Sequence, residues 1–211
     1  MGAVAPAWAN SPASGVLPGA PLTIDDLLEA EADTAVAAEP AIARPVLVRP
    51  MMQSTYARPT SVQNAVRRIS LLNLHTDERC SVVYKEAGRP VPDALKEVNR
   101  VLRDFRTGEV HPMDTGLLDL MADLHDRMDA SGPFHIISGY RSPKTNSMLH
   151  EKSDGVATKS LHMQGMAVDI RLPGRQLASV RDTALAMGRG GVGYYARSDF
   201  VHVDVGRVRR W

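Results

Sequence analysis

Apolar and polar residues alternate along two short segments in the second half of the chain. Residues 167–172 place three aliphatic side chains on one face of a predicted strand and Asp169 on the other. Residues 200–205 place three valines on one face and His202 and Asp204 on the reverse. Each strand therefore buries an aliphatic face, and Asp169 and His202 converge if the two strands are neighbours.

Similar patterns predict further strands. Residues 69–75 alternate, residues 76–79 suit a turn, and residues 80–84 form the second strand of a predicted hairpin. Residues 134–140 form an apolar strand that ends in Ser-Gly-Tyr. The glycine-rich run at 190–193 leads to the strand that carries the histidine.

Helical spacing of apolar residues predicts three helices. The first starts at Pro92 and continues to near Gly108, the second runs from about 114 to 128, and the third covers 176–187. Gly188 ends the third helix. The order of these elements predicts an α+β fold in which helices pack on a small antiparallel sheet.

Residues 1–60 are rich in alanine, proline and small polar residues, and several prolines interrupt any long element. We expect a flexible leader or stalk here and a single domain over residues 61–211. An ordered arm, with residues 45–48 as an edge strand, is the alternative. The polar segment 147–155 is expected to form a loop beside the functional site.

Composition narrows the class of protein. The chain has 211 residues, 44% of them hydrophobic, and a formal net charge of +1. It can bury one full core, and it has no charge excess that would indicate a nucleic-acid partner. No apolar run reaches about eighteen residues, so no transmembrane segment is predicted. Cys80 is the only cysteine, so no internal disulfide can form, and an inert thiol is expected.

Two histidines and a carboxylate form a candidate metal triad, with two of them on these predicted strands and His162 on a short loop that joins them. His162, Asp169 and His202 offer imidazole and carboxylate ligands, and a catalytic zinc site keeps three such protein ligands and a water. The first two ligands are seven residues apart, which excludes the helical His-Glu-x-x-His arrangement. Asp199 stands three residues before His202 and is a candidate base for the water.

Each of these residues also has a simpler interpretation. A single histidine or aspartate on a strand is more often hydrogen-bonded or solvated than a metal ligand, so the pattern alone leaves both alternatives open. Asp204 either orients a metal-bound histidine or is a turn or surface carboxylate. Arg141 follows the strand 134–140 and is either a solvated charge or a cation at the rim of a sheet, where sites are commonly built. The remaining histidines lack the paired spacing and are expected to be structural or exposed: His75, His111, His125, His135 and His150.

Four blocks of sequence carry a resemblance to a known superfamily. Residues 138–146, 160–170, 190–195 and 200–204 resemble, in the same order, the zinc D-Ala-D-Ala carboxypeptidase and hedgehog-like metallopeptidase superfamily. Within it they most resemble the murein endopeptidase K branch. The similarity extends from about residue 69 to 211.

The resemblance implies a role for each candidate residue. His162, Asp169 and His202 would bind zinc, Asp199 would be the catalytic base, and Arg141 would face the scissile carbonyl. The chemistry agrees with these roles, because bound zinc lowers the pKa of its water to about 7 and a carboxylate can then take the proton. A fixed cation stabilises the oxyanion that forms on the carbonyl.

The function implied is that of a zinc metallopeptidase, a peptidoglycan endopeptidase that hydrolyses amide bonds in cell-wall peptide cross-links. D-Ala-D-Ala carboxypeptidase activity is one alternative, and a non-catalytic zinc-containing module that binds wall peptides is another. The partners expected are peptidoglycan peptides; the sequence does not indicate an oligomeric state. A periplasmic or otherwise exported location is expected from the family resemblance. Ala7-Trp8-Ala9 matches the small-x-small pattern of a signal-peptidase site, but no basic or apolar region precedes it, so these residues by themselves favour an ordinary alanine-rich segment.

Overall fold

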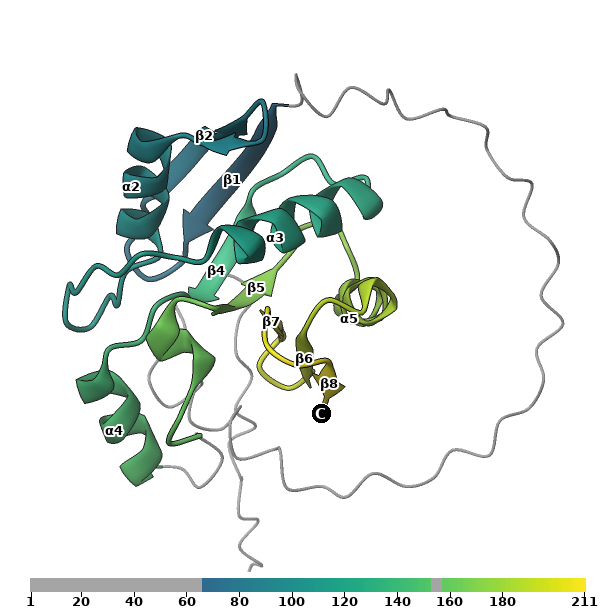
Figure 1. The fold of residues 1–211 in the computed structure, drawn as a ribbon. Helices are drawn as coiled ribbons and strands as arrows, with labels where there is room; N and C mark the ends of the chain where they lie inside the picture. The colour runs from purple at the N-terminus through teal and green to yellow at the C-terminus, as the bar shows by residue number, and fades with distance from the viewer. Residues whose placement is uncertain (1–65, 153–156) are drawn as a thin grey trace, which may run out of the picture.

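The computed structural model describes residues 66–152 and 157–211 (Figure 1). The leader predicted over residues 1–60, with its alternative edge strand at 45–48, lies outside the described residues. The boundary at residue 60 therefore stays a prediction. None of the described helices is long and apolar enough to cross a lipid bilayer.

A central sheet of eight strands, in the order β3-β2-β1-β4-β5-β7-β6-β8, organises the described part of the chain. The strands are β1 Arg67–Asn73, β2 Arg79–Glu86, β3 Arg89–Pro90, β4 Phe134–Ser138, β5 Ala167–Arg171, β6 Gly191–Tyr195, β7 Phe200–Asp204 and β8 Arg209–Arg210. The α-helices are α2 Pro92–Val101, α3 Thr115–Arg127, α4 Pro143–Lys152 and α5 Leu177–Met187, and η3 Leu161–Gln164 is a 3-10 helix.

The α+β class is confirmed, but the prediction of a small antiparallel sheet is wrong. Helices α2 and α3 lie between β1 and β4 in the chain, and this crossover lets the two strands pair in parallel. Strands β6 and β8 also pair in parallel. Strands β3 and β8 have two residues each, too few for an alternating pattern to reveal them.

One face of the sheet forms the main core. Helices α2, α3 and α5 pack on it, whereas α4 lies apart from them (Figure 1). Alternate residues of the central strands point into this core and are fully or almost fully buried: Leu71, Ile136, Ile170, Val201 and Val203. These are the aliphatic faces that the sequence predicts, and their burial drives the pairing of the strands.

Helix α2 ends at Val101, before the predicted end near Gly108. The side chain of Asp104 accepts hydrogen bonds from the backbone N–H groups of Arg106 and Thr107, which closes a turn where the helix would continue. Phe105, expected on the helix, stacks on His75 instead.

The predicted loop at 147–155 is wrong over residues 147–152, which belong to α4. Pro143 starts this helix, the hydroxyl of Ser142 accepts a hydrogen bond from the N–H of Thr145, and Leu149 is buried. Residues 153–156 lie outside the described residues. Helix α4 has one strongly buried apolar residue, so it lacks the stripe from which helices are predicted.

The opposite face of the sheet is polar near its centre. Strands β5 and β7 are antiparallel neighbours, as predicted, and Asp169 pairs in register with His202. A small apolar cluster, built on Ile137 and Phe200, lies beside them. Cys80 belongs to the main core, and burial raises the pKa of its thiol to about 12, which agrees with the inert thiol expected.

Candidate metal centre

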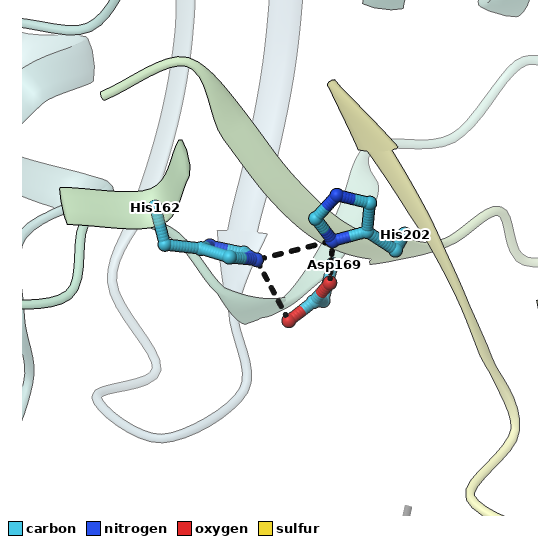
Figure 2. A group of neighbouring side chains, drawn as sticks. All are labelled: His162, Asp169 and His202. Carbon is cyan, nitrogen blue, oxygen red and sulfur yellow. Dashed lines mark hydrogen bonds and ion pairs between the residues drawn. The ribbon is translucent and has the colours of Figure 1, made fainter. Parts of the chain in front are cut away.

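Three elements bring His162, Asp169 and His202 together. His162 lies on η3, Asp169 on β5 and His202 on β7, and their side chains point toward one another (Figure 2). One ligand atom from each residue lies within 4.8 Å of the others. His202 Nδ1 lies 2.9 Å from Asp169 Oδ1, and His162 Nε2 lies 3.3 Å from Asp169 Oδ2. The structure therefore joins the three predicted ligands in one cluster.

A short 3-10 turn sets the place of His162. The Ser160 hydroxyl accepts a hydrogen bond from the His162 N–H, which caps η3. The turn ends at Gly165, whose φ is +66°. A Cβ atom at this position would lie 2.3 Å from the carbonyl oxygen of Pro112, so the turn can approach that loop only with glycine.

A backbone carbonyl orients the His162 ring. Nδ1 of His162 lies 2.8 Å from the carbonyl oxygen of Gly139, which can only accept, so this nitrogen carries the proton. Nε2 then presents its lone pair to the cluster. Gly139 is itself tightly packed, because a Cβ atom there would lie 2.4 Å from the carbonyl oxygen of Leu102.

A buried carboxylate orients the His202 ring. Nε2 of His202 lies 3.1 Å from Oδ2 of Asp204, so Nε2 donates and Nδ1 faces the cluster. Asp204 also accepts hydrogen bonds from the N–H groups of Gly191 and Gly206 and an ion pair from Arg209 at 2.7 Å. Burial raises the pKa of Asp204, but these hydrogen bonds outweigh burial and hold it well below its usual range. The structure therefore favours the first interpretation of Asp204, because this residue is a buried carboxylate that contacts the ring of His202.

The electrostatics of the cluster favour a cation. Burial raises the pKa of Asp169, but the two histidines outweigh this effect and keep the carboxyl ionised. Burial lowers the pKa of His202, but Asp169 and Asp204 together outweigh burial and raise this pKa above its usual range. Positive charge is therefore stabilised between these groups. Two imidazole nitrogens and a carboxylate oxygen form a donor set that suits zinc and other first-row metals. The donor set and its orientation therefore fit a metal ion.

Arg141 lies beside this cluster. Its side chain is buried, and its Nη2 is 3.9 Å from Asp169 Oδ2. The backbone N–H of Arg141 donates to the carbonyl oxygen of His162. Asp104, which the sequence analysis missed, accepts from the N–H of Ser142 and holds the turn that carries the arginine. The guanidinium group is thus placed at the cluster.

Asp199 stands outside the cluster, at the residue before β7. Its side chain is 66% exposed, and its Oδ2 lies 3.1 Å from Nε of Arg171. Arg171 also donates to the backbone carbonyl of Ser198, and Asp199 has a φ of +54°. Asp199 and Arg171 line a cavity of about 650 Å³ whose wall includes Leu74. The candidate base is therefore solvent-accessible and lies at the edge of an open space.

Trp211 is a neighbour of the cluster that the sequence analysis did not identify. Its ring centroid lies 5.1 Å from that of His202. It lies over Gly193, on the strand next to His202. No local periodicity connects residue 211 to the cluster, because a contact with a glycine on another strand leaves no pattern in the sequence.

The fold and the buried cluster define a candidate hydrolytic metal site on a mixed sheet. A family model described as peptidoglycan L,D-endopeptidase MepK matches residues 61–211, and the chain belongs to this family. The protein named peptidoglycan L,D-endopeptidase MepK from Escherichia coli (strain K12) is 40% identical over 145 residues, which cover 69% of this chain and 80% of that protein. The protein from Haemophilus influenzae named probable peptidoglycan L,D-endopeptidase MepK is 38% identical over 146 residues, 69% of this chain and 78% of that protein. No solved structure gives a significant match.

Membership in this family confirms the resemblance found in the sequence. It also confirms the predicted class of enzyme, a metallopeptidase. The match starts at residue 61 and so covers the whole of the predicted domain and none of residues 1–60.

Proposed function

We propose that this protein is a zinc-dependent endopeptidase that hydrolyses the peptide cross-links of peptidoglycan, including those of the L,D type. The observation that carries the proposal is the buried cluster of His162, Asp169 and His202, with both imidazole lone pairs directed to one point. The names of the E. coli and H. influenzae relatives support the substrate. Action on the wall would require export of the protein to the periplasm or cell surface.

Zinc held by these three residues would polarise the scissile carbonyl and lower the pKa of a bound water. The protein contributes the arrangement around it. The Gly139 carbonyl and the Asp204 carboxylate keep one nitrogen of each histidine protonated and the other available as a ligand. The ligands are therefore oriented before a metal binds.

Arg141 is the proposed stabiliser of the oxyanion. Its guanidinium group is buried and lies 3.9 Å from a carboxylate oxygen of Asp169, so its charge acts in a setting that water screens little. A cation fixed beside the cluster stabilises the negative charge that develops on the substrate carbonyl.

Asp199 is the proposed general base and then the donor of a proton to the leaving amine. Its carboxylate is exposed and faces solvent at the edge of the cavity, where a water can exchange. Catalytic hydrogen bonds are often formed only when substrate is bound, so the ion pair with Arg171 is compatible with this role.

The printed names of the E. coli and H. influenzae relatives support endopeptidase over carboxypeptidase activity. A cross-linked peptide continues on both sides of the scissile amide and needs space on both sides. The cavity of about 650 Å³ that Asp199 lines is the proposed place for one side of this peptide.

The decisive experiment digests purified peptidoglycan with zinc-loaded protein and analyses the products by mass spectrometry. Conversion of cross-linked dimers to monomers is expected. Release of terminal D-alanine alone would establish the carboxypeptidase, and full zinc content without any cleavage would establish the binding module. His150→Ala is a matched control, because His150 is exposed on α4 and lies outside the cluster.

A further inference from the structure

The indole of Trp211 is an exposed aromatic surface beside a proposed metal ligand. The residue is 41% exposed, and it is the one aromatic among the large exposed hydrophobic residues of the described chain. Its ring lies 5.1 Å from the ring of His202, centroid to centroid. The indole is therefore a neighbour of His202, one of the three residues of the cluster.

Several contacts hold the indole in this place. Its Nε1–H donates to the hydroxyl of Tyr195 at 2.8 Å. The guanidinium of Arg209 lies 4.8 Å from the ring centroid, a distance at which a cation is attracted to an aromatic face. The Trp211 backbone pairs with β6, donating to the Val192 carbonyl and accepting from the Tyr194 N–H. An exposed tryptophan with this many contacts is ordered before substrate binds.

The neighbouring strand is adapted to the ring. A Cβ atom at Gly193 would lie 2.7–2.9 Å from three atoms of the indole, too close for any other residue without displacement of the ring. Gly193 pairs in register with His202 on β7. Because Gly193 has no side chain, the indole can pack beside His202, the proposed metal ligand.

We propose that Trp211 is a substrate-contacting residue that flanks the cluster on the β6 side. Its exposed face packs on the aliphatic part of the wall-peptide residue next to the scissile amide. The inference rests on the proposed function, because it takes the substrate to be a peptide bound at the cluster. Alanine methyl groups and the methylene chain of diaminopimelate are apolar groups of a size that an indole face can cover.

The experiment uses the tryptophan as its own reporter. The chain has two tryptophans, Trp8 and Trp211, so Trp8→Phe leaves Trp211 as the sole emitter. In the zinc-loaded Trp8→Phe, Asp199→Asn protein, a cross-linked tetrapeptide dimer is expected to shift the emission to shorter wavelength in a saturable way. Binding of the same dimer is measured independently by calorimetry.

Kinetics of single variants then distinguish a residue that contacts substrate from one that only supports His202. Trp211→Ala is expected to raise KM roughly 10-fold, and Trp211→Phe less, with little change in kcat and with zinc retained. Val208→Ala is the matched control, because Val208 is 67% exposed on the same segment. It should leave both constants unchanged.

Two results would overturn the proposal. Calorimetric binding of the dimer without any change in Trp211 emission would show that substrate does not reach the indole. Loss of zinc from Trp211→Ala and Trp211→Phe with KM unchanged would show that Trp211 only supports His202. A wild-type protein that neither binds nor cleaves the dimer would instead overturn the proposed function itself, and this assignment with it.

Discussion

The two ends of strand β7 differ sharply in how firmly they hold their functional side chains. At the C-terminal end, Asp204 is fully buried and accepts hydrogen bonds from two backbone N–H groups, from Arg209 and from His202. At the N-terminal end, Asp199 is 66% exposed and has an ion pair with Arg171. The difference indicates a division of labour, in which the proposed metal ligands are held firmly by buried contacts and the proposed base can exchange partners and protons.

The largest effect is expected from loss of a ligand. His202→Ala removes one of three donors, and the two that remain cannot hold the ion with useful affinity, since ligand loss costs orders of magnitude. Zinc content after dialysis and cleavage of cross-linked muropeptides should both fall to background, as they should for His162→Ala and Asp169→Ala. Full zinc occupancy in any of the three variants would contradict the ligand assignment.

Asp199→Asn should separate turnover from metal binding. The substitution keeps the size of the side chain but removes the basic carboxylate, so turnover is expected to fall by about 10²–10⁴ while zinc stays bound. The free energy of unfolding should change by less than about 1 kcal/mol, because an exposed ion pair contributes little. Wild-type cleavage by this variant would place the base elsewhere.

Arg141→Ala provides a second variant that is expected to lose turnover but keep zinc. Loss of a charge that stabilises the oxyanion is expected to reduce kcat by about 10²–10³ with zinc retained. Because Arg141 is buried beside Asp169, thermal unfolding of the variant is measured alongside, and Arg141→Lys serves as the conservative comparison. Equal kcat for wild type and a folded Arg141→Ala protein would exclude the proposed role.

Asp204→Asn tests the C-terminal end of β7, where Asp204 is buried. The change keeps the shape but leaves Arg209 without its charge partner, and His202 without a carboxylate acceptor. Zinc affinity is expected to fall by about 10–100-fold, and the free energy of unfolding by about 1–3 kcal/mol. Zinc titration against a competing chelator and urea denaturation measure the two effects. If the variant matched wild type in both, Asp204 would not be the group that orients the ligand.

The parts of this fold that could be predicted from the sequence are those in which one local pattern decides the structure. Strands β5 and β7 follow from alternation, and α3 follows from its apolar stripe and from Asp114, whose side chain caps the first turn at Gly116. The same alternation placed Asp169 and His202 on one face. The roles of Arg141 and Asp199 came from the family resemblance, and the structure by itself places only the first of them at the cluster.

The rest depends on contacts between distant residues. The parallel pairing of β1 with β4 is a consequence of the helices that lie between them, and α4 is stabilised by a cap and one buried leucine rather than by a stripe. Strand β6 contains two glycines, which disfavour a strand by propensity. Gly193 is explained only by Trp211, which packs in the space that its missing side chain leaves.

The smallest effect is expected from Arg171→Ala, which removes the ion-pair partner of the exposed Asp199. Arg171 bonds the Asp199 carboxylate, and it also donates to the carbonyl oxygens of Ser198 and Asp199, so its loss loosens the turn before β7. Stability should fall by about 1 kcal/mol or less, since the Asp199 side of the ion pair is 66% exposed. Turnover should fall far less than in Asp199→Asn, because the base itself remains. Urea denaturation and the kcat of both variants, measured on zinc-loaded protein, decide the matter. A loss of turnover as large as that of Asp199→Asn would mean that the ion pair positions the base, and the proposed base would then be as firmly held as the ligands at the other end of the strand.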